Sequence, residues 1–191
     1  MKNTNKTALI IGLGNIGKQY EGTRHNVGFV VVDKLAKHLQ VGFSCQAKLL
    51  ADVARARQII IAKPTTLMNR SGLSVSKIRD YYKIPIENII VISDDYHLDL
   101  GQVRLRFEGE SGGHNGLESV IEQISGGFWR LRIGIGEVND KKAEEYVLGR
   151  FTLAEMNLIN KVIDRAIEFL LESLSDKKLE NKSFIVGPED K

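Results

Sequence analysis

The sequence of 191 residues contains one cysteine, Cys45, and only three prolines. A single cysteine excludes an intramolecular disulfide, so a reducing compartment, the cytoplasm, is expected. Long hydrophobic runs are missing as well. The polar segment 1–6 is followed by an apolar run that is too brief for the core of a signal peptide or for a membrane span. The sequence therefore predicts a cytoplasmic protein without a membrane segment.

A large excess of charge of one sign is also absent. The 27 lysines and arginines stand against 24 aspartates and glutamates, which gives a formal net charge of +3. This mildly basic balance permits a polyanionic partner such as nucleic acid but does not demand one. The chain is 42% hydrophobic. It can bury a core of ordinary size, and its length suits one globular domain spanning 1–191.

Short apolar runs predict the buried strands of an α/β fold. These runs occupy residues 7–11, 58–62 and 88–93. The segment around Arg104 and Arg106 instead alternates apolar and basic residues, and so does the segment around Arg130 and Arg132. Each of these two segments is expected to form a strand with one basic face.

Helical spacing of apolar residues predicts four helices between and after the strands. The first three cover residues 27–39, 74–82 and 117–124. The last begins at a capping box of Thr152 and Glu155 and is expected to end near Ser175. Beyond it, residues 176–191 are charged and rich in lysine, so we expect a loosely ordered tail.

One motif suggests a dinucleotide site. Residues 12–17 match G-x-G-x-x-G after a predicted strand, and Asp33 lies near the distance of a ribose-binding acid. The mechanism, however, needs a helix that opens inside the motif so that its N-terminus faces the pyrophosphate. Residues 18–26 are polar, contain Gly22, and lack helical periodicity. A glycine-lined loop after the first strand is therefore favoured over a dinucleotide site.

A second motif suggests a serine nucleophile. Residues 109–113 match G-x-S-x-G, and the order His25, Asp94, Ser111 imitates one class of serine protease. An α/β-hydrolase, however, carries its histidine well after the serine, and here the only later histidine is His114. The protease order belongs to paired β-barrels, whereas this chain alternates strands with helices. A flexible glycine loop is the better interpretation of this motif.

Metal ligands show no recognisable spacing. The four histidines form no H-E-x-x-H pattern and Cys45 stands alone. Asp94, Asp95 and Asp99 could hold Mg²⁺, but a solvated acidic cluster at a strand end is the simpler interpretation. No metal and no cofactor are predicted.

Polar residues gather in five short motifs. They are Gly-Leu-Gly-Asn (12–15), Thr-Arg-His-Asn (23–26), Lys-Pro-Thr-Thr-Leu-Met-Asn-Arg-Ser-Gly (63–72), Gly-Gly-His-Asn-Gly (112–116) and Arg-Leu-Arg-Ile-Gly-Ile-Gly (130–136). In this order and spacing they resemble the bacterial-type peptidyl-tRNA hydrolase family. The resemblance runs from about Leu9 to the final helix, and five motifs in register are highly specific. It implies one α/β domain with a mixed β-sheet flanked by helices on both faces.

The resemblance implies hydrolysis of the ester between a peptide and the tRNA 3′ end, a reaction of translation and ribosome rescue. His25 is then the base that activates water, and Asp94 orients the imidazole and stabilises its charged form. The resemblance adds Asn15 and Asn115 to the catalytic residues. It places the substrate contacts at Tyr20, Asn26, Leu67, Met68, Asn69, His114 and Asn115. Amides of this kind can hold peptide carbonyls or donate to an oxyanion.

Other interpretations of these residues stay open from the sequence. Asn115 with Glu118 also suits a helix cap, and His114 either assists the site or packs beneath it. Asn69 also suits the start of a loop before the next helix.

The same resemblance assigns Arg104, Arg106 and Arg132 to tRNA phosphate, which arginine grips in a bidentate manner. Alternating arginines could instead only keep two strand faces soluble. Two positions depart from the family, namely Ile16 in place of a proline and His97 in place of an acid. The expected protein is a monomer without an obligate protein partner, and the alternative is a non-catalytic RNA-binding protein of the same fold.

Overall fold

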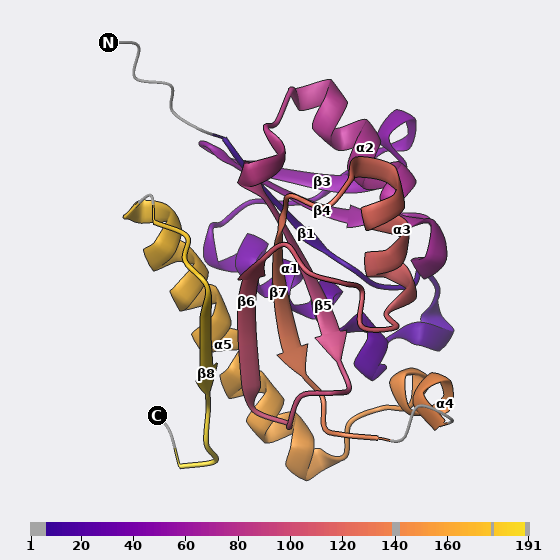
Figure 1. Ribbon diagram of the computed structural model, residues 1–191, viewed down its shortest axis with the longest axis vertical. Coiled ribbons are helices and arrows are strands. Elements are labelled where there is room, and N and C mark those ends of the chain that lie inside the picture. The colour runs from indigo at the N-terminus through magenta and orange to yellow at the C-terminus, as the bar shows by residue number, and fades with distance from the viewer. Residues whose placement is uncertain (1–6, 139–141, 177, 190–191) are drawn as a thin grey trace.

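The computed structural model describes residues 7–138, 142–176 and 178–189, which form a sheet with helices packed on it (Figure 1). Within these residues the strand order is β2-β3-β4-β1-β5-β7-β6-β8. The strands are β1 (Ala8–Gly12), β2 (Ser44–Gln46), β3 (Ala51–Ala56), β4 (Ile59–Pro64), β5 (Ile89–Asp95), β6 (Gln102–Phe107), β7 (Trp129–Gly134) and β8 (Lys182–Ile185). The neighbours from β4 to β7 pair in parallel, whereas β2, β3, β6 and β8 pair antiparallel. The sheet is mixed, as predicted.

Helices cover both faces of this sheet. Successive residues of its central strands point to opposite faces, and both sets are apolar. Ile10 of β1 packs with α1 (Val27–His38) and α5 (Leu153–Ser175), whereas Leu9 and Ile11 pack with α2 (Ser71–Tyr82) and α3 (Asn115–Ile124). The shorter helices are η1 (Lys18–Tyr20), η2 (Arg24–Asn26), η3 (Ala47–Leu49), η4 (Met68–Arg70), η5 (Ile86–Asn88) and α4 (Ala143–Leu148). The predicted two-sided α/β architecture is confirmed.

The glycines after β1 allow close helix packing. A Cβ atom on Gly12 would lie 2.2 Å from the carbonyl oxygen of Gly28, so α1 can approach the end of β1 only because this position is glycine. The helix begins at Val27, ten residues after the motif. Asp33 is exposed on α1 and pairs with Lys63 at 2.6 Å. These residues therefore shape the packing beside the site and do not form a dinucleotide loop.

Several elements differ from the prediction. The helices α2 and α3 begin three and two residues earlier than expected, at Ser71 and Asn115. The predicted loose tail is wrong for Lys182–Ile185, which form β8 and pair with β6 in an antiparallel register. None of the helices built from the described residues is both long enough and apolar enough to cross a membrane.

Candidate active site

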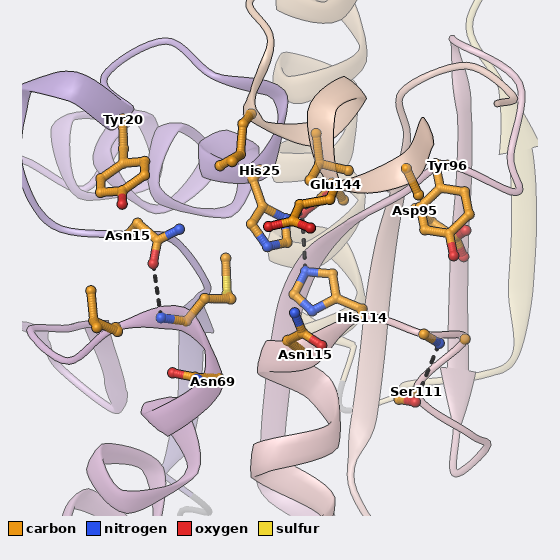
Figure 2. A pocket seen from close by; sticks show the side chains of 18 residues that line it. Asn15, Tyr20, His25, Asn69, Asp95, Tyr96, Ser111, His114, Asn115 and Glu144 are labelled. Atoms are coloured by element: carbon orange, nitrogen blue, oxygen red, sulfur yellow. Dashed lines mark hydrogen bonds and ion pairs between the residues drawn. The ribbon is translucent and has the colours of Figure 1, made fainter. Parts of the chain in front are cut away.

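A pocket of about 510 Å³ opens at the carboxyl ends of β1 and β5 (Figure 2). Side chains from distant parts of the chain meet there, as expected for an α/β fold, whose sites form where strands end. We call this cavity the catalytic pocket. Its lining is Asn15, Tyr20, His25, Leu67, Met68, Asn69, Asp94, Asp95, Tyr96, Ser111, Gly112, Gly113, His114, Asn115, Ala143, Glu144, Val147 and Leu148.

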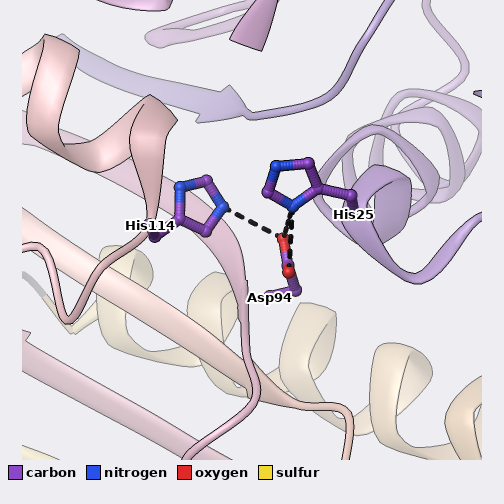
Figure 3. Close-up of side chains that lie close together, drawn as sticks. All are labelled: His25, Asp94 and His114. Atoms are coloured by element: carbon purple, nitrogen blue, oxygen red, sulfur yellow. Dashed lines mark hydrogen bonds and ion pairs between the residues drawn. The ribbon is translucent and has the colours of Figure 1, made fainter. Parts of the chain in front are cut away.

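His25 and Asp94 form the buried centre of the pocket. His25 lies on η2, and its Nδ1 atom is 3.0 Å from both carboxylate oxygens of Asp94, the penultimate residue of β5. Because a carboxylate only accepts, Nδ1 carries the proton and donates it to Asp94. Figure 3 shows the second ring nitrogen of His25 turned away from Asp94. In the neutral ring that nitrogen, Nε2, carries the lone pair that a general base requires.

His114 binds the same carboxylate in the opposite tautomer. Its Nε2 atom lies 3.0 Å from Asp94 Oδ1, while its Nδ1 atom accepts the backbone N–H groups of Gly116 at 3.0 Å and Leu117 at 3.2 Å. His114 is therefore the N-cap of α3, in the place that the sequence suggested for Asn115. Since Nδ1 accepts, Nε2 must hold the proton. This histidine is a fixed donor to Asp94 and not a second base.

The two imidazoles control the charge of Asp94. Burial alone would raise the pKa of this carboxyl, but His114 and His25 outweigh burial and hold its pKa well below the usual range. Asp94 is only 2% exposed and accepts from both rings. It is therefore ionised at neutral pH and stabilises positive charge that develops on His25.

Asn15 is fixed so that its amide N–H groups are available. Its side-chain oxygen accepts the backbone N–H of Met68 at 2.8 Å, and Asn26 brackets its backbone with bonds of 2.8 and 2.9 Å. With the oxygen occupied, the amide nitrogen is the group left to serve a ligand. Asn15 is held in this way although Ile16 replaces the family's proline. Asn26 was expected to touch substrate, but it lies outside the pocket lining because both of its amide groups hold Asn15.

The other predicted substrate contacts do line the pocket. Asn69 on η4 and Asn115 at the start of α3 are exposed and face the cavity from neighbouring helices (Figure 2). Met68 is buried at 4% exposure and Leu67 is 52% exposed. With Tyr20 of η1, these residues add apolar and aromatic surface beside the amides. Such a lining suits a peptide, which offers carbonyl acceptors and side chains of mixed polarity.

Within the described residues, neither the serine nucleophile nor the aspartate site for Mg²⁺ assembles. Ser111 lies on the glycine loop, where its hydroxyl accepts the N–H of Gly113 at 3.3 Å, while both pocket histidines turn to Asp94. His25, Asp94 and His114 have ligand atoms within 4.8 Å of one another and could hold a metal ion only if their shared protons were displaced. The three aspartates considered for Mg²⁺ diverge, since Asp95 pairs with Arg132 at 2.9 Å and Asp99 is exposed.

Sequence reasoning missed one wall of the pocket. The short helix α4 contributes Ala143, Glu144, Val147 and Leu148. Its six residues, AEEYVL, carry no motif. Its position depends on Arg24, which precedes His25 and packs over the ring of Tyr146 at 4.3 Å. No pattern within 143–148 could have indicated that contact. His97, the second departure from the family, is exposed, and its ring lies 4.1 Å from that of Tyr96.

A second cavity of about 400 Å³ adjoins the first, and Gly112 lines both. We call it the arginine pocket, since Arg104 and Arg106 of β6 line it with Arg130 and Arg132 of β7. The register places Arg104 opposite Arg132 and Arg106 opposite Arg130. Glu108 and Glu110 line the same cavity and offset part of this charge. Like charges directly opposite each other destabilise a sheet, and the excess of arginine over glutamate in the lining favours an anionic ligand.

Arg130 is the exception in the arginine pocket. It was expected on an exposed basic face, but it is 1% exposed, its guanidinium lies 4.0 Å from the centre of the Phe128 ring, and it donates to the Phe128 carbonyl at 3.0 Å. Burial, together with Arg132, lowers its pKa to about 10. Arg130 therefore adds positive charge beneath the pocket and cannot serve to keep the strand soluble.

Comparison with known proteins gives one consistent result. A family model described as Peptidyl-tRNA hydrolase matches residues 9–186. The Peptidyl-tRNA hydrolase of Rickettsia bellii (strain OSU 85-389) is 41% identical, with 93% of this chain and 99% of the relative covered. That of Aquifex aeolicus (strain VF5) is 45% identical, with 87% and 89% covered. A crystal structure of peptidyl-tRNA hydrolase from Acinetobacter baumannii superposes with a TM-score of 0.86 at 34% identity, covering 91% of each chain.

Proposed function

This chain belongs to the peptidyl-tRNA hydrolase family, and on that premise we propose that it hydrolyses the ester bond of peptidyl-tRNA with His25 as the base. The family predicted from the five motifs is confirmed. The products are a free peptide and a reusable tRNA. One observation carries the proposal, namely that His25 Nδ1 is engaged by Asp94 while Nε2 stays free in the catalytic pocket.

The reaction follows from that tautomer. His25 Nε2 takes a proton from water, and the water oxygen bonds to the ester carbonyl carbon. The tetrahedral intermediate then breaks its bond to the ribose oxygen, which leaves with the proton that the imidazolium returns. Asp94, ionised and held by His114, stabilises the imidazolium between these steps. No step of this scheme requires a metal or a cofactor.

Neutral amides are proposed to hold the reacting group. The free N–H groups of Asn15 can donate to the developing oxyanion, since the side-chain oxygen of Asn15 is already bonded to Met68. Asn69 and Asn115, whose amides face the cavity, can bind peptide carbonyls as well as peptide N–H groups. Amides lack charge, so they bind a peptide backbone without selecting for its side chains.

The arginine pocket is proposed to bind tRNA phosphate next to the reacting ester. Arg104, Arg106 and Arg132 line it, and the shared Gly112 places it beside the catalytic pocket. Arg132 reaches Asp95 at 2.9 Å, so one ion pair spans the two cavities. A non-catalytic RNA-binding role would use the arginines but would leave the arrangement of His25 and Asp94 without a purpose. The enzyme is expected to act as a monomer in the cytoplasm.

Release of an N-acetylated amino acid from acylated tRNA tests the proposal. His25→Ala should lower kcat by about 10² to 10⁴-fold, the contribution typical of a general base, with a small change in KM. His38→Ala is the matched control, because His38 is exposed on α1 outside the catalytic pocket. Equal rates in the parent and His25→Ala would refute the mechanism. Tight tRNA binding without hydrolysis by the parent would favour the RNA-binding role.

A further inference from the structure

The catalytic pocket contains one carboxylate that its chemistry does not use. Three acids line the pocket, namely Asp94, Asp95 and Glu144. Asp94 accepts from two histidines, and Asp95 pairs with Arg132 at 2.9 Å and accepts the His97 N–H at 2.9 Å. Glu144 is exposed to the cavity and has no hydrogen bond or ion pair to any residue that the structure describes. No described side chain therefore pairs with this carboxylate.

The direction of Glu144 follows from the geometry of α4. Residues three and four apart share a helix face, and Val147 and Leu148 stand at those spacings from Glu144. All three line the catalytic pocket, whereas Glu145 does not. Figure 2 shows Glu144 across the pocket from Asn69 and Asn115, the amides proposed to bind peptide. A peptide bound to those amides would therefore lie between them and the face of α4 that carries Glu144.

The helix α4 is anchored beside His25 and not left free. Tyr146 donates its hydroxyl to the Ile135 carbonyl at 2.7 Å, and the guanidinium of Arg24 lies 4.3 Å from the centre of its ring. Arg24 also bonds both carboxylate oxygens of Glu155 and the Arg150 carbonyl. Because Arg24 is adjacent to His25 in η2, one residue ties the helix carrying Glu144 to the segment carrying the base.

From this geometry we propose that Glu144 makes the enzyme favour peptidyl groups whose side chain next to the ester is a cation, as in lysine or arginine. The inference rests on the proposed function, since it presumes that the peptide occupies the catalytic pocket. An unpaired carboxylate in a partly enclosed site attracts an ammonium or guanidinium group and repels an acid. Among the described residues of the lining, no lysine or arginine offsets this charge.

The test compares two substrates that carry the same tRNA, one acylated with Nα-acetyl-lysine and the other with Nα-acetyl-norleucine. Norleucine keeps the four-carbon side chain of lysine but lacks the ammonium group. We expect the parent enzyme to show a kcat/KM that is about two- to fivefold higher for the lysine substrate, the range of a partly exposed ion pair. Glu144→Gln should bring the ratio of the two values close to one while leaving the norleucine rate unchanged. Glu145→Gln is the control, with the same change of charge on the same helix outside the pocket.

Each outcome separates the inference from the proposed function. If Glu144→Gln leaves the substrate ratio unchanged, or if Glu145→Gln lowers it equally, Glu144 does not select the side chain and the inference is wrong. A Glu144→Gln variant that loses the same activity on both substrates would also overturn it. In all three cases the parent still hydrolyses both substrates, so the proposed function stands. If the parent hydrolysed neither substrate, both the proposed function and the inference would be overturned.

Discussion

The catalytic pocket and the arginine pocket lie side by side, but they differ in how their charged groups are paired. In the catalytic pocket the central carboxylate, Asp94, is almost fully satisfied, because His25 and His114 both bond to it. In the arginine pocket four arginines stand opposite one another in register on β6 and β7, and Glu108 and Glu110 also line the cavity. Among the described residues, only Arg132 of these four forms an ion pair with a carboxylate, that of Asp95. The hydrogen bonds of the first cavity are complete within the protein, whereas the second is proposed to bind an anionic ligand.

This difference assigns separate tasks to the two cavities. A preorganised set of hydrogen bonds lowers the barrier of a chemical step, because its dipoles need no rearrangement during reaction. Unpaired arginines contribute binding that depends on salt, because each phosphate contact releases counterions. Substitutions in the catalytic pocket should therefore change kcat, and substitutions in the arginine pocket should change KM.

The largest effect is expected from Asp94→Asn. An amide at this position can offer an N–H group to His25 Nδ1, which would move the imidazole proton to Nε2 and remove the base. We expect kcat to fall by about 10³ to 10⁴-fold, as the equivalent change does in a catalytic triad. Asp99→Asn, at an exposed acid of the next loop, is the control. Parallel losses in the two variants would show that the carboxylate has no special role.

A smaller loss is expected from Asn15→Ala, which removes the proposed oxyanion donor. The kcat should fall by about 10²-fold, the typical contribution of one such donor, with little change in KM. Asn26→Ala should give part of this loss, because Asn26 fixes the backbone of Asn15 through two hydrogen bonds. The single-turnover rates of both variants measure these losses. Asn157→Ala, at an exposed asparagine of α5, is the control. An effect on KM alone would instead assign Asn15 to ground-state binding.

The smallest effect is expected from Arg106→Ala and should appear only in binding. We expect KM to rise on the order of tenfold with kcat unchanged, since one charge-assisted hydrogen bond to phosphate is lost. The slope of log(kcat/KM) against log(salt) should become shallower by about 0.7 to 0.9. Arg55→Ala on β3, near the opposite edge of the sheet, removes the same charge far from the pocket. A similar change in both variants would mean that net charge alone is responsible.

The sequence predicts the parts of this molecule that depend on local pattern. The central strands β1, β4 and β5 can be predicted from the sequence, because burial on both faces requires a continuous apolar run in each of them. This pattern is missing from β3, with the sequence ADVARA, and from the four residues of β8. These strands form because they pair with neighbouring strands, which their own composition does not reveal.

In the site, too, some features follow from local sequence pattern and others from contacts between distant residues. The family resemblance points to His25, Asp94 and the pocket asparagines, but it does not indicate which of their atoms are free. The sequence suggests Asn115 as a cap of this helix, whereas the structure makes His114 the acceptor, because its ring reaches the backbone N–H groups of Gly116 and Leu117. The position of Glu144 depends on contacts of Arg24 with residues more than 100 positions away, which no local window contains.

The tautomers of the two pocket histidines test the central claim most directly. Nitrogen NMR of the ¹⁵N-labelled imidazoles at neutral pH distinguishes a protonated ring nitrogen from one with a free lone pair. The geometry predicts a proton on Nδ1 and a bare Nε2 in His25, with the reverse in His114. A proton on Nε2 of His25, with Nδ1 bare, would contradict the assignment of this residue as the base.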